Sequence, residues 1–205
     1  MKRSHRTLGI LTVAAVAAGA WWLSGQRAES NEARHLVNRV WVERMPTDSR
    51  DVFGKLVVLD TPDGKFGVVG RSSTWVHHYE VFLWRLAGDR LSAFFPQHGV
   101  RDRVRVRTWA CEGEAPEPFE LCLEVSNERG RGRFYSMRAW EVRPHDVEGT
   151  ASEIPGMAGA LEILDAHPGH EGAVPDDGVA EVPGRLLDAV LPEGRGAGDP
   201  RPSAG

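Results

Sequence analysis

The stretch that decides the fold is RDRVRVRTWAC (residues 101–111), which is followed after a turn by FELCLEV (residues 119–125). Arginine occupies every second position from Arg101 to Arg107, and two valines lie between these arginines. Successive side chains of a β-strand point to opposite faces, so one face of this segment is charged and the other is apolar. The pattern predicts a strand with one buried face.

The FELCLEV segment alternates in the same way and places Glu120, Cys122 and Glu124 opposite its apolar residues. A hairpin with Cys111 and Cys122 on one side also places the arginine row (101, 103, 105 and 107) beside both glutamates. Two cysteines this close in sequence usually form a disulfide in an oxidising compartment, and two free thiols in a core are the alternative. We therefore expect a hairpin with a Cys111–Cys122 disulfide, although a register shift of one residue would turn every side chain over.

Apolar runs separated by turn clusters extend outward from this hairpin through residues 35–143. No stretch there keeps a helical period for three turns. The pattern predicts an all-β domain, an antiparallel up-and-down meander of about eight strands. We expect this meander to close into a small barrel or to curl into two packed sheets, because an open sheet would leave long edges unprotected. The expected strands are residues 36–44, 55–59, 65–70, 78–86, 90–95, 103–111, 119–125 and 133–142.

Residues 78–86 differ from the other runs because both faces of the expected strand are largely apolar. Such a strand is covered on two sides, or one of its sides lines an apolar cavity. Trp41, Phe82 and Trp84 are therefore the candidate ligand-binding residues, and packing in the core is the alternative for most of the domain's tryptophans. The arginine row is a candidate for an anionic ligand, with a solvated strand face as its alternative.

Motifs for catalysis are absent from the sequence: it has no G-x-S-x-G elbow, no H-E-x-x-H helix, no P-loop and no G-x-G-x-x-G turn. His78 and Glu80 share a face but make an incomplete metal site. His167 and His170 lie in a segment with nothing to hold their geometry. We expect no enzyme activity, no cofactor and no metal site.

Residues 1–26 read as a signal peptide or a membrane anchor, with a basic start and an apolar run over residues 7–23. The small residues 18–20 fit a signal-peptidase site, whereas Trp21 and Trp22 resemble the aromatic belt of a short membrane span, so both interpretations stay open. Either one predicts export of the rest of the chain, to the periplasm, to an inner-membrane anchor facing the periplasm, or to the medium. Membrane contact is expected only through residues 7–23.

Residues 144–205 form an acidic segment that contains none of the chain's aromatic residues but eight of its 13 prolines and eleven of its 23 glycines. Its composition cannot offset the entropy of ordering it, so we expect a disordered tail with short helices at residues 157–164 and 185–191. The tail carries a charge of −9 and the first 143 residues +5. Without the basic N-terminus the domain keeps only about +2, which argues against a nucleic-acid partner.

Five short segments carry a resemblance to a known group of proteins: NRVWVE (38–43), EVFLW (80–84), FFPQ (94–97), FELCLE (119–124) and RFYS (133–136). Their order is similar to that in a family of uncharacterised exported proteins of myxobacteria, which look like lipocalin-type, or calycin, small β-barrels. The chain departs from the lipocalin opening motif at residues 38–40, where Asn-Arg-Val replaces the Gly-x pattern. The resemblance covers residues 35–143 and implies a lipocalin-like barrel that binds a hydrophobic small molecule, with no catalytic residues.

The expected function is therefore that of a cell-envelope binding protein for a small hydrophobic ligand. The alternative is a ligand-free envelope module for protein interaction or structure, with a flexible acidic tail. The oligomeric state stays open.

Overall fold

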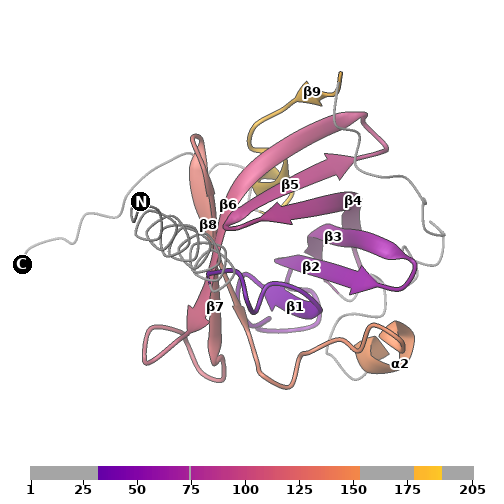
Figure 1. Ribbon diagram of the computed structural model, residues 1–205. Helices are drawn as coiled ribbons and strands as arrows, with labels where there is room; N and C mark the ends of the chain where they lie inside the picture. The colour runs from indigo at the N-terminus through magenta and orange to yellow at the C-terminus, as the bar shows by residue number, and fades with distance from the viewer. Residues whose placement is uncertain (1–31, 74, 153–177, 191–205) are drawn as a thin grey trace, which may run out of the picture.

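The computed structural model describes residues 32–73, 75–152 and 178–190, and its meander of eight antiparallel strands is shown in Figure 1. Neighbouring strands pair in the order β5-β4-β3-β2-β1-β8-β7-β6, and β5 pairs with β6, so the sheet closes on itself as a barrel. The strands are β1 (Arg39–Val42), β2 (Phe53–Thr61), β3 (Gly64–Ser72), β4 (His77–Ala87), β5 (Arg90–Phe95), β6 (Val100–Ala110), β7 (Leu121–Asn127) and β8 (Gly130–Ser136).

Each segment expected to form a strand overlaps with one observed strand, so the prediction of an all-β antiparallel meander is confirmed. The first and last segments differ most. Strand β1 begins only at Arg39, and β8 ends at Ser136, six residues before the expected boundary at Val142. The residues after Ser136 no longer pair with β7 but continue beside β1, where Glu141 forms an isolated bridge with Arg39, and Trp140 and Val142 pack against the outside of the barrel.

Apolar side chains from all eight strands fill the barrel interior. Trp41 and Phe82 are fully buried there, and Trp84 is 3% exposed. A Cβ added at Gly67 would lie 2.3 Å from the Phe82 ring, so a glycine on β3 is needed to make room for this phenylalanine. The strand residues of this cluster are Trp41, Leu56, Val58, Val69, Phe82, Trp84, Leu91, Ala93, Phe95, Val104, Val106, Leu121, Leu123, Val125 and Phe134.

Segments from outside the meander complete this core. Leu36 precedes β1, is fully buried, and its carbonyl oxygen accepts a hydrogen bond from the Trp41 indole at 3.1 Å. Leu186, Leu187 and Val190 come from the helix α4 (Arg185–Asp188) and the residues after it, and they are at most 3% exposed. The apolar core thus includes residues that lie far after the meander in the sequence. We call residues 178–190 the C-terminal plug.

The expectation of a disordered tail after Arg143 therefore needs correction for the C-terminal plug and for residues 144–152. The tail is poor in apolar residues on average, but Leu186, Leu187 and Val190 lie on one side of a helical turn and supply a local apolar face. Within the tail the structure also describes the helix α2 (Val147–Ser152). The remaining tail residues lie outside the described residues.

Polar contacts fasten the C-terminal plug to the barrel. The Asp102 side chain points into the barrel, where its carboxylate accepts hydrogen bonds from the Leu186 N–H at 2.9 Å and the Gly184 N–H at 3.2 Å. The Arg185 guanidinium donates to both carboxylate oxygens of Glu80, at 2.7 and 3.1 Å. The short strand β9 (Ala180–Glu181) pairs in parallel with the start of β6, as Figure 1 shows.

The cysteine hairpin forms largely as expected, with Cys111 and Cys122 joined in a disulfide. Arg107 lies opposite Glu124 on the outer face, and the apolar residues of β6 and β7 face inward. Two details differ from the prediction. Arg101 is only 6% exposed, at the place where β9 pairs with β6, and Glu120 makes its ion pair with Arg138 rather than with the arginine row. The disulfide is consistent with an oxidising compartment.

The predicted signal or anchor segment lies outside the described residues. Among the helices that the structure does describe, none has the length and apolar character needed to cross a membrane.

Replacing Leu186 with alanine should lower the free energy of unfolding by about 2–4 kcal/mol, because the change empties part of a filled core. Urea unfolding followed by tryptophan fluorescence measures this loss. The matched control is Val182→Ala, at a plug residue that is 37% exposed, and it should change stability by less than about 0.5 kcal/mol. Equal stabilities for Leu186→Ala and the unchanged chain would contradict a packed plug.

Candidate functional site

A second apolar cluster lies outside the barrel, over β1 and β2. Sequence reasoning expected residues 78–86 to be covered on both faces or to line an apolar cavity with one of them, and the outer face of that strand, β4, is only half-buried. Strand β1 and the first part of β2 are buried on both faces, because the chain after β8 and the β6–β7 connection pack against them. The buried members are Val40, Val42, Phe53, Val57, Leu59, Phe119, Trp140 and Val142.

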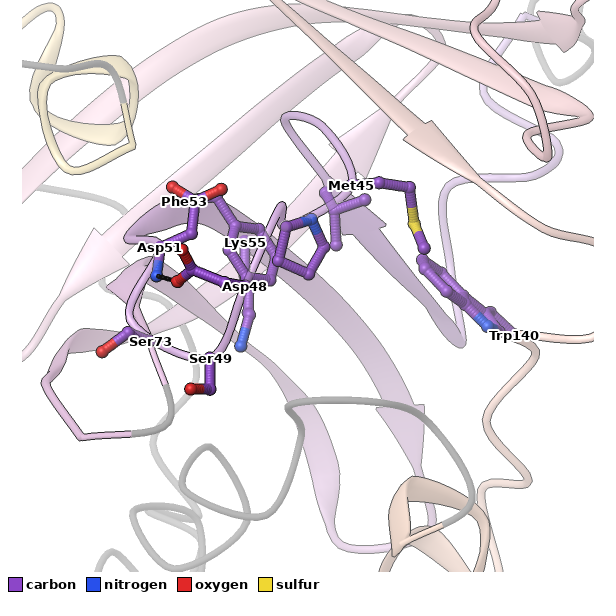
Figure 2. Close-up of a pocket in the computed structure, with 10 residues that line it drawn as sticks. Met45, Asp48, Ser49, Asp51, Phe53, Lys55, Ser73 and Trp140 are labelled. Atoms are coloured by element: carbon purple, nitrogen blue, oxygen red, sulfur yellow. Dashed lines mark hydrogen bonds between the residues drawn. The ribbon is translucent and has the colours of Figure 1, made fainter.

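A pocket of about 240 Å³ opens at the edge of this cluster, and we call it the outer hollow (Figure 2). Its walls come from β1, β2, the loop between them, the residue after β3 and the segment after β8. The apolar lining is Val42, Met45, Pro46, Phe53 and Trp140, and the polar lining is Asp48, Ser49, Asp51, Lys55 and Ser73.

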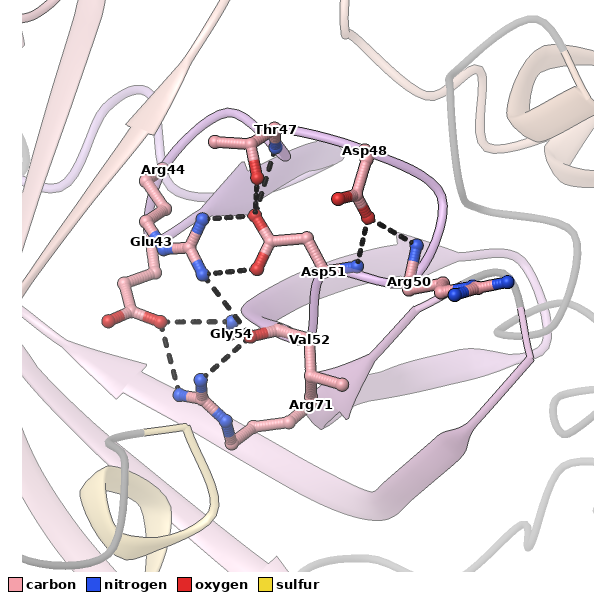
Figure 3. A network of polar contacts seen from close by, with 9 residues as sticks. All are labelled: Glu43, Arg44, Thr47, Asp48, Arg50, Asp51, Val52, Gly54 and Arg71. Atoms are coloured by element: carbon pink, nitrogen blue, oxygen red, sulfur yellow. Dashed lines mark hydrogen bonds and ion pairs between the residues drawn. The ribbon is translucent and has the colours of Figure 1, made fainter.

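The β1–β2 loop, residues 43–52, is held in shape by its own charged groups (Figure 3). The Arg44 guanidinium binds both carboxylate oxygens of Asp51, and Asp51 also accepts a hydrogen bond from the Thr47 N–H at 2.9 Å. The Arg44 hydrogen bonds hold the pKa of Asp51 well below its usual range. Asp51 therefore keeps its negative charge, and the positive charge of Arg44 balances it. The role of Asp51 in the outer hollow is to shape the wall.

The base of the loop is tied to the barrel, as Figure 3 shows, and also to the C-terminal plug. The Glu43 carboxylate accepts hydrogen bonds at 3.1 Å from the Arg71 guanidinium and from the Gly54 N–H. Arg71 also donates to the carbonyl oxygens of Val52, at 3.0 Å, and of Val190. One arginine on β3 thus connects the wall of the outer hollow to the plug.

Lys55 is the buried charged group of the outer hollow (Figure 2). It points outward from β2 between Val42 and Gly70, its partners on the two neighbouring strands, and it is only 3% exposed. The Lys55 ammonium lies 4.6 Å from the centroid of the Phe53 ring. Burial lowers the pKa of Lys55 to about 8, because the charged form has lost most of its hydration.

The choice of lysine at this position is unusual for the chain. Only three of its 25 basic residues are lysines, namely Lys2, Lys55 and Lys65, and the other 22 are arginines. A guanidinium stays charged at any physiological pH, whereas an amine can lose its proton when it is buried. The outer hollow therefore combines apolar walls with a polar group that can be a cation or a neutral amine.

The predicted ligand-binding residues lie elsewhere. Trp41, Phe82 and Trp84 come together inside the barrel, and none of them lines the outer hollow. Both indole N–H groups there donate to backbone carbonyl oxygens, that of Trp84 to Leu59 at 2.9 Å. A ligand among these three residues stays a prediction. Sequence reasoning missed Lys55, whose signal is a lone charge inside the apolar run that begins at Phe53.

The arginine face carries a separate polar pocket of about 260 Å³. Arg105 and Arg107 line it together with three carboxylates, and Arg105 pairs with Asp89 at 2.8 Å. Carboxylates therefore outnumber arginines around this pocket, which disfavours an anionic ligand. The lining is Glu32, Asp89, Arg105, Arg107, Glu124 and Ser126.

The histidine motif of β4 does not assemble into a metal site. His77 and His78 are exposed, and Glu80 is engaged by Arg185. Within residues 32–73, 75–152 and 178–190, no three His, Cys, Asp or Glu side chains are grouped so that they could hold a metal ion. The tail histidines at 167 and 170 lie outside the described ranges.

No family model, no curated protein and no solved structure matches this chain. The resemblance to exported myxobacterial barrels therefore stays a prediction, and a proposal about function has to rest on the geometry of the described residues.

Replacing Lys55 with methionine should raise the free energy of unfolding, relative to the unchanged chain, more at pH 7 than at pH 10, because burial penalises the charged form of Lys55 and the substitution removes that penalty. The folded pKa of about 8 lies below the unfolded value of 10.5, so the penalty is complete below pH 8 and disappears as the pH rises to 10.5. Urea unfolding at pH 7 and pH 10 measures both effects.

The control for this substitution is Lys65→Met, because the Lys65 side chain is 54% exposed and its replacement removes no buried charge. A stability difference between Lys55→Met and the unchanged chain that is the same at both pH values would contradict a depressed pKa.

Proposed function

We propose that this chain is a non-catalytic binding protein of the cell envelope and that it holds a small amphipathic ligand in the outer hollow. The observation that carries the proposal is a buried lysine beside apolar walls in a pocket of about 240 Å³. Binding sites typically combine such walls with a few polar groups that orient the ligand. Placement in the envelope is supported by the predicted export segment and by the Cys111–Cys122 disulfide.

The filled interior favours the outer hollow over the barrel interior as the binding site. An eight-stranded barrel either holds one small ligand or is filled by its own side chains. Here Leu36 and the plug residues Leu186, Leu187 and Val190 add to the side chains from every strand. A ligand inside would have to displace packed groups, whereas the outer hollow is already open.

The lining of the outer hollow defines the class of ligand. Trp140, Met45 and Phe53 offer apolar contact to a short alkyl or aryl body. The Lys55 ammonium favours a head group that accepts hydrogen bonds, and a carboxylate gains most because the bond is then charge-assisted. Such a ligand favours the charged form of Lys55 and so offsets part of the cost of its burial.

A second candidate function is a ligand-free envelope module for protein interaction or structure. The filled interior supports it, as does the Trp75 side chain, which is 75% exposed beside the 41% exposed Val76. Exposed tryptophans are enriched at protein interfaces. This candidate predicts that small amphipathic molecules do not bind.

Octanoate should bind the full chain at least tenfold more tightly than octanol at pH 7, because only the carboxylate forms a charge-assisted bond with Lys55. Isothermal titration calorimetry measures both affinities. Lys55→Met should abolish the preference for octanoate, and Met45→Ala, at the rim, should weaken both ligands. Affinity for octanoate should fall as the pH rises above the Lys55 pKa, because the neutral amine loses the ion pair.

The control variant is Phe82→Leu, which alters the barrel interior and should leave the affinity for octanoate within about twofold. Loss of binding in Phe82→Leu, with retention in Lys55→Met, would move the site into the interior. Absence of heat with both ligands would favour the interaction module.

A further inference from the structure

We infer that the outer side of strands β5 to β8 docks on an anionic phospholipid surface. This inference goes beyond the proposed function, and it adds a second membrane contact to the one expected from residues 7–23. The docking surface, which we call the basic face, consists of Arg90, Arg103, Arg105, Arg107, Trp109, Arg131 and Arg133.

The charges of the basic face are unbalanced. Its six arginines are all exposed. Along β5 to β8, which the structure describes in full, Glu124 is the one acidic side chain that points outward, since Asp102 points into the barrel. Carboxylates pair with three of the arginines, in the ion pairs Arg103–Glu181 at 3.1 Å, Arg105–Asp89 at 2.8 Å and Arg131–Glu124 at 3.3 Å.

The other three arginines, Arg90, Arg107 and Arg133, have no carboxylate partner among the described residues. Arg90 also lies directly opposite Arg105 on the neighbouring strand, and like charges at such positions repel each other. The basic face therefore retains positive charge that the fold does not neutralise. Lipid phosphates suit these groups, because a guanidinium binds a phosphate through two parallel hydrogen bonds.

Trp109 lies among the unpaired arginines. The guanidinium carbons of Arg107 and Arg133 are 5.5 and 5.9 Å from the centroid of its ring. Trp109 is also opposite Cys122 in the β6–β7 ladder, so the disulfide holds the hairpin next to it. An indole beside cationic groups is typical of proteins at the level of the lipid head groups.

The polar pocket beside Arg105 and Arg107 does not contradict a lipid partner. Its carboxylates Asp89 and Glu124 are already paired with arginines of the basic face. A small anion inside the pocket would meet these carboxylates. A broad membrane surface would instead contact the exposed arginines around it.

The described chain begins beside the basic face. Thr108, on β6, donates hydrogen bonds to the carbonyl oxygen of Glu32 from its N–H at 2.6 Å and from its hydroxyl at 3.1 Å. Residues 24–31 separate the predicted anchor from Glu32, and a chain of this length spans at most about 28 Å. A retained anchor would thus keep the basic face close to the lipid surface, where a high effective concentration makes a weak attraction sufficient.

Docking through the basic face leaves the outer hollow open. The strand order places β6 across the barrel from β2, which forms part of the outer hollow. Membrane contact and ligand entry therefore do not compete.

Arginine labelling tests the inference. The full chain is mixed at low salt with vesicles of phosphatidylcholine, or of an equal mixture of phosphatidylcholine and phosphatidylglycerol. Phenylglyoxal then modifies accessible guanidinium groups, which peptide mass spectrometry identifies. We expect labelling of Arg90, Arg107 and Arg133 to be at least about fivefold slower with the anionic vesicles, and high salt should remove this protection. Arg50, exposed on the β1–β2 loop, should be labelled equally with both vesicle types.

Two double variants isolate the basic face. Arg107→Gln/Arg133→Gln should remove most of the protection of Arg90, because the shared surface loses two unpaired charges. Arg50→Gln/Arg143→Gln removes the same charge from exposed positions outside the basic face and should retain the protection. Circular dichroism verifies that each variant folds.

Equal labelling of Arg90, Arg107 and Arg133 with both vesicle types would overturn the inference. Equal loss of protection in the two double variants would also overturn it, because net charge rather than the basic face would then attract the lipid. Either result leaves octanoate binding in the outer hollow, and so the proposed function, to be decided by calorimetry alone.

Discussion

Closure of the sheet at β1 is the constraint on which the rest of the structure depends. This strand has four residues, pairs with β2 along its whole length, and meets β8 through Val42 and Tyr135. The chain after β8 continues the seam, with backbone hydrogen bonds from the Val40 N–H to the Trp140 carbonyl oxygen at 3.2 Å and from the Val142 N–H to the Asn38 carbonyl oxygen at 2.8 Å. Closing the barrel therefore also brings Trp140 over its outside, where it forms a wall of the outer hollow.

The outer hollow illustrates how stability and function compete at one residue. Lys55 lies beside the apolar side chains of Val42 and Phe53, and burial of its charged form has a desolvation cost. The surrounding network of Arg44, Asp51, Glu43 and Arg71 is fully paired and holds the loop over this lysine. Retaining a buried amine in a rigid setting is typical of binding and reactive sites, where perturbed pKa values concentrate. The geometry thus favours a ligand-linked role for Lys55 over a purely architectural one.

Local alternation in the sequence was sufficient to predict the strands, the meander and the cysteine hairpin. It was insufficient where burial comes from remote segments. Residues that follow β8 cover the outer faces of β1 and β2, and Arg101 is buried where β9 pairs with β6. The alternation within a strand indicates neither of these contacts. The sequence predicted a short helix at residues 185–191, which α4 confirms over Arg185–Asp188, but average composition gave no indication that Leu186, Leu187 and Val190 enter the barrel core. The site was sought among tryptophans, but Trp41 and Trp84 pack in the core.

The C-terminal plug also dictates when the molecule can finish folding. Leu186, Leu187 and Val190 follow the eight barrel strands in sequence, so a nascent polypeptide has no complete core until residues 178–190 have left the ribosome. Translation from the N-terminus therefore produces the barrel strands first and their final filling last.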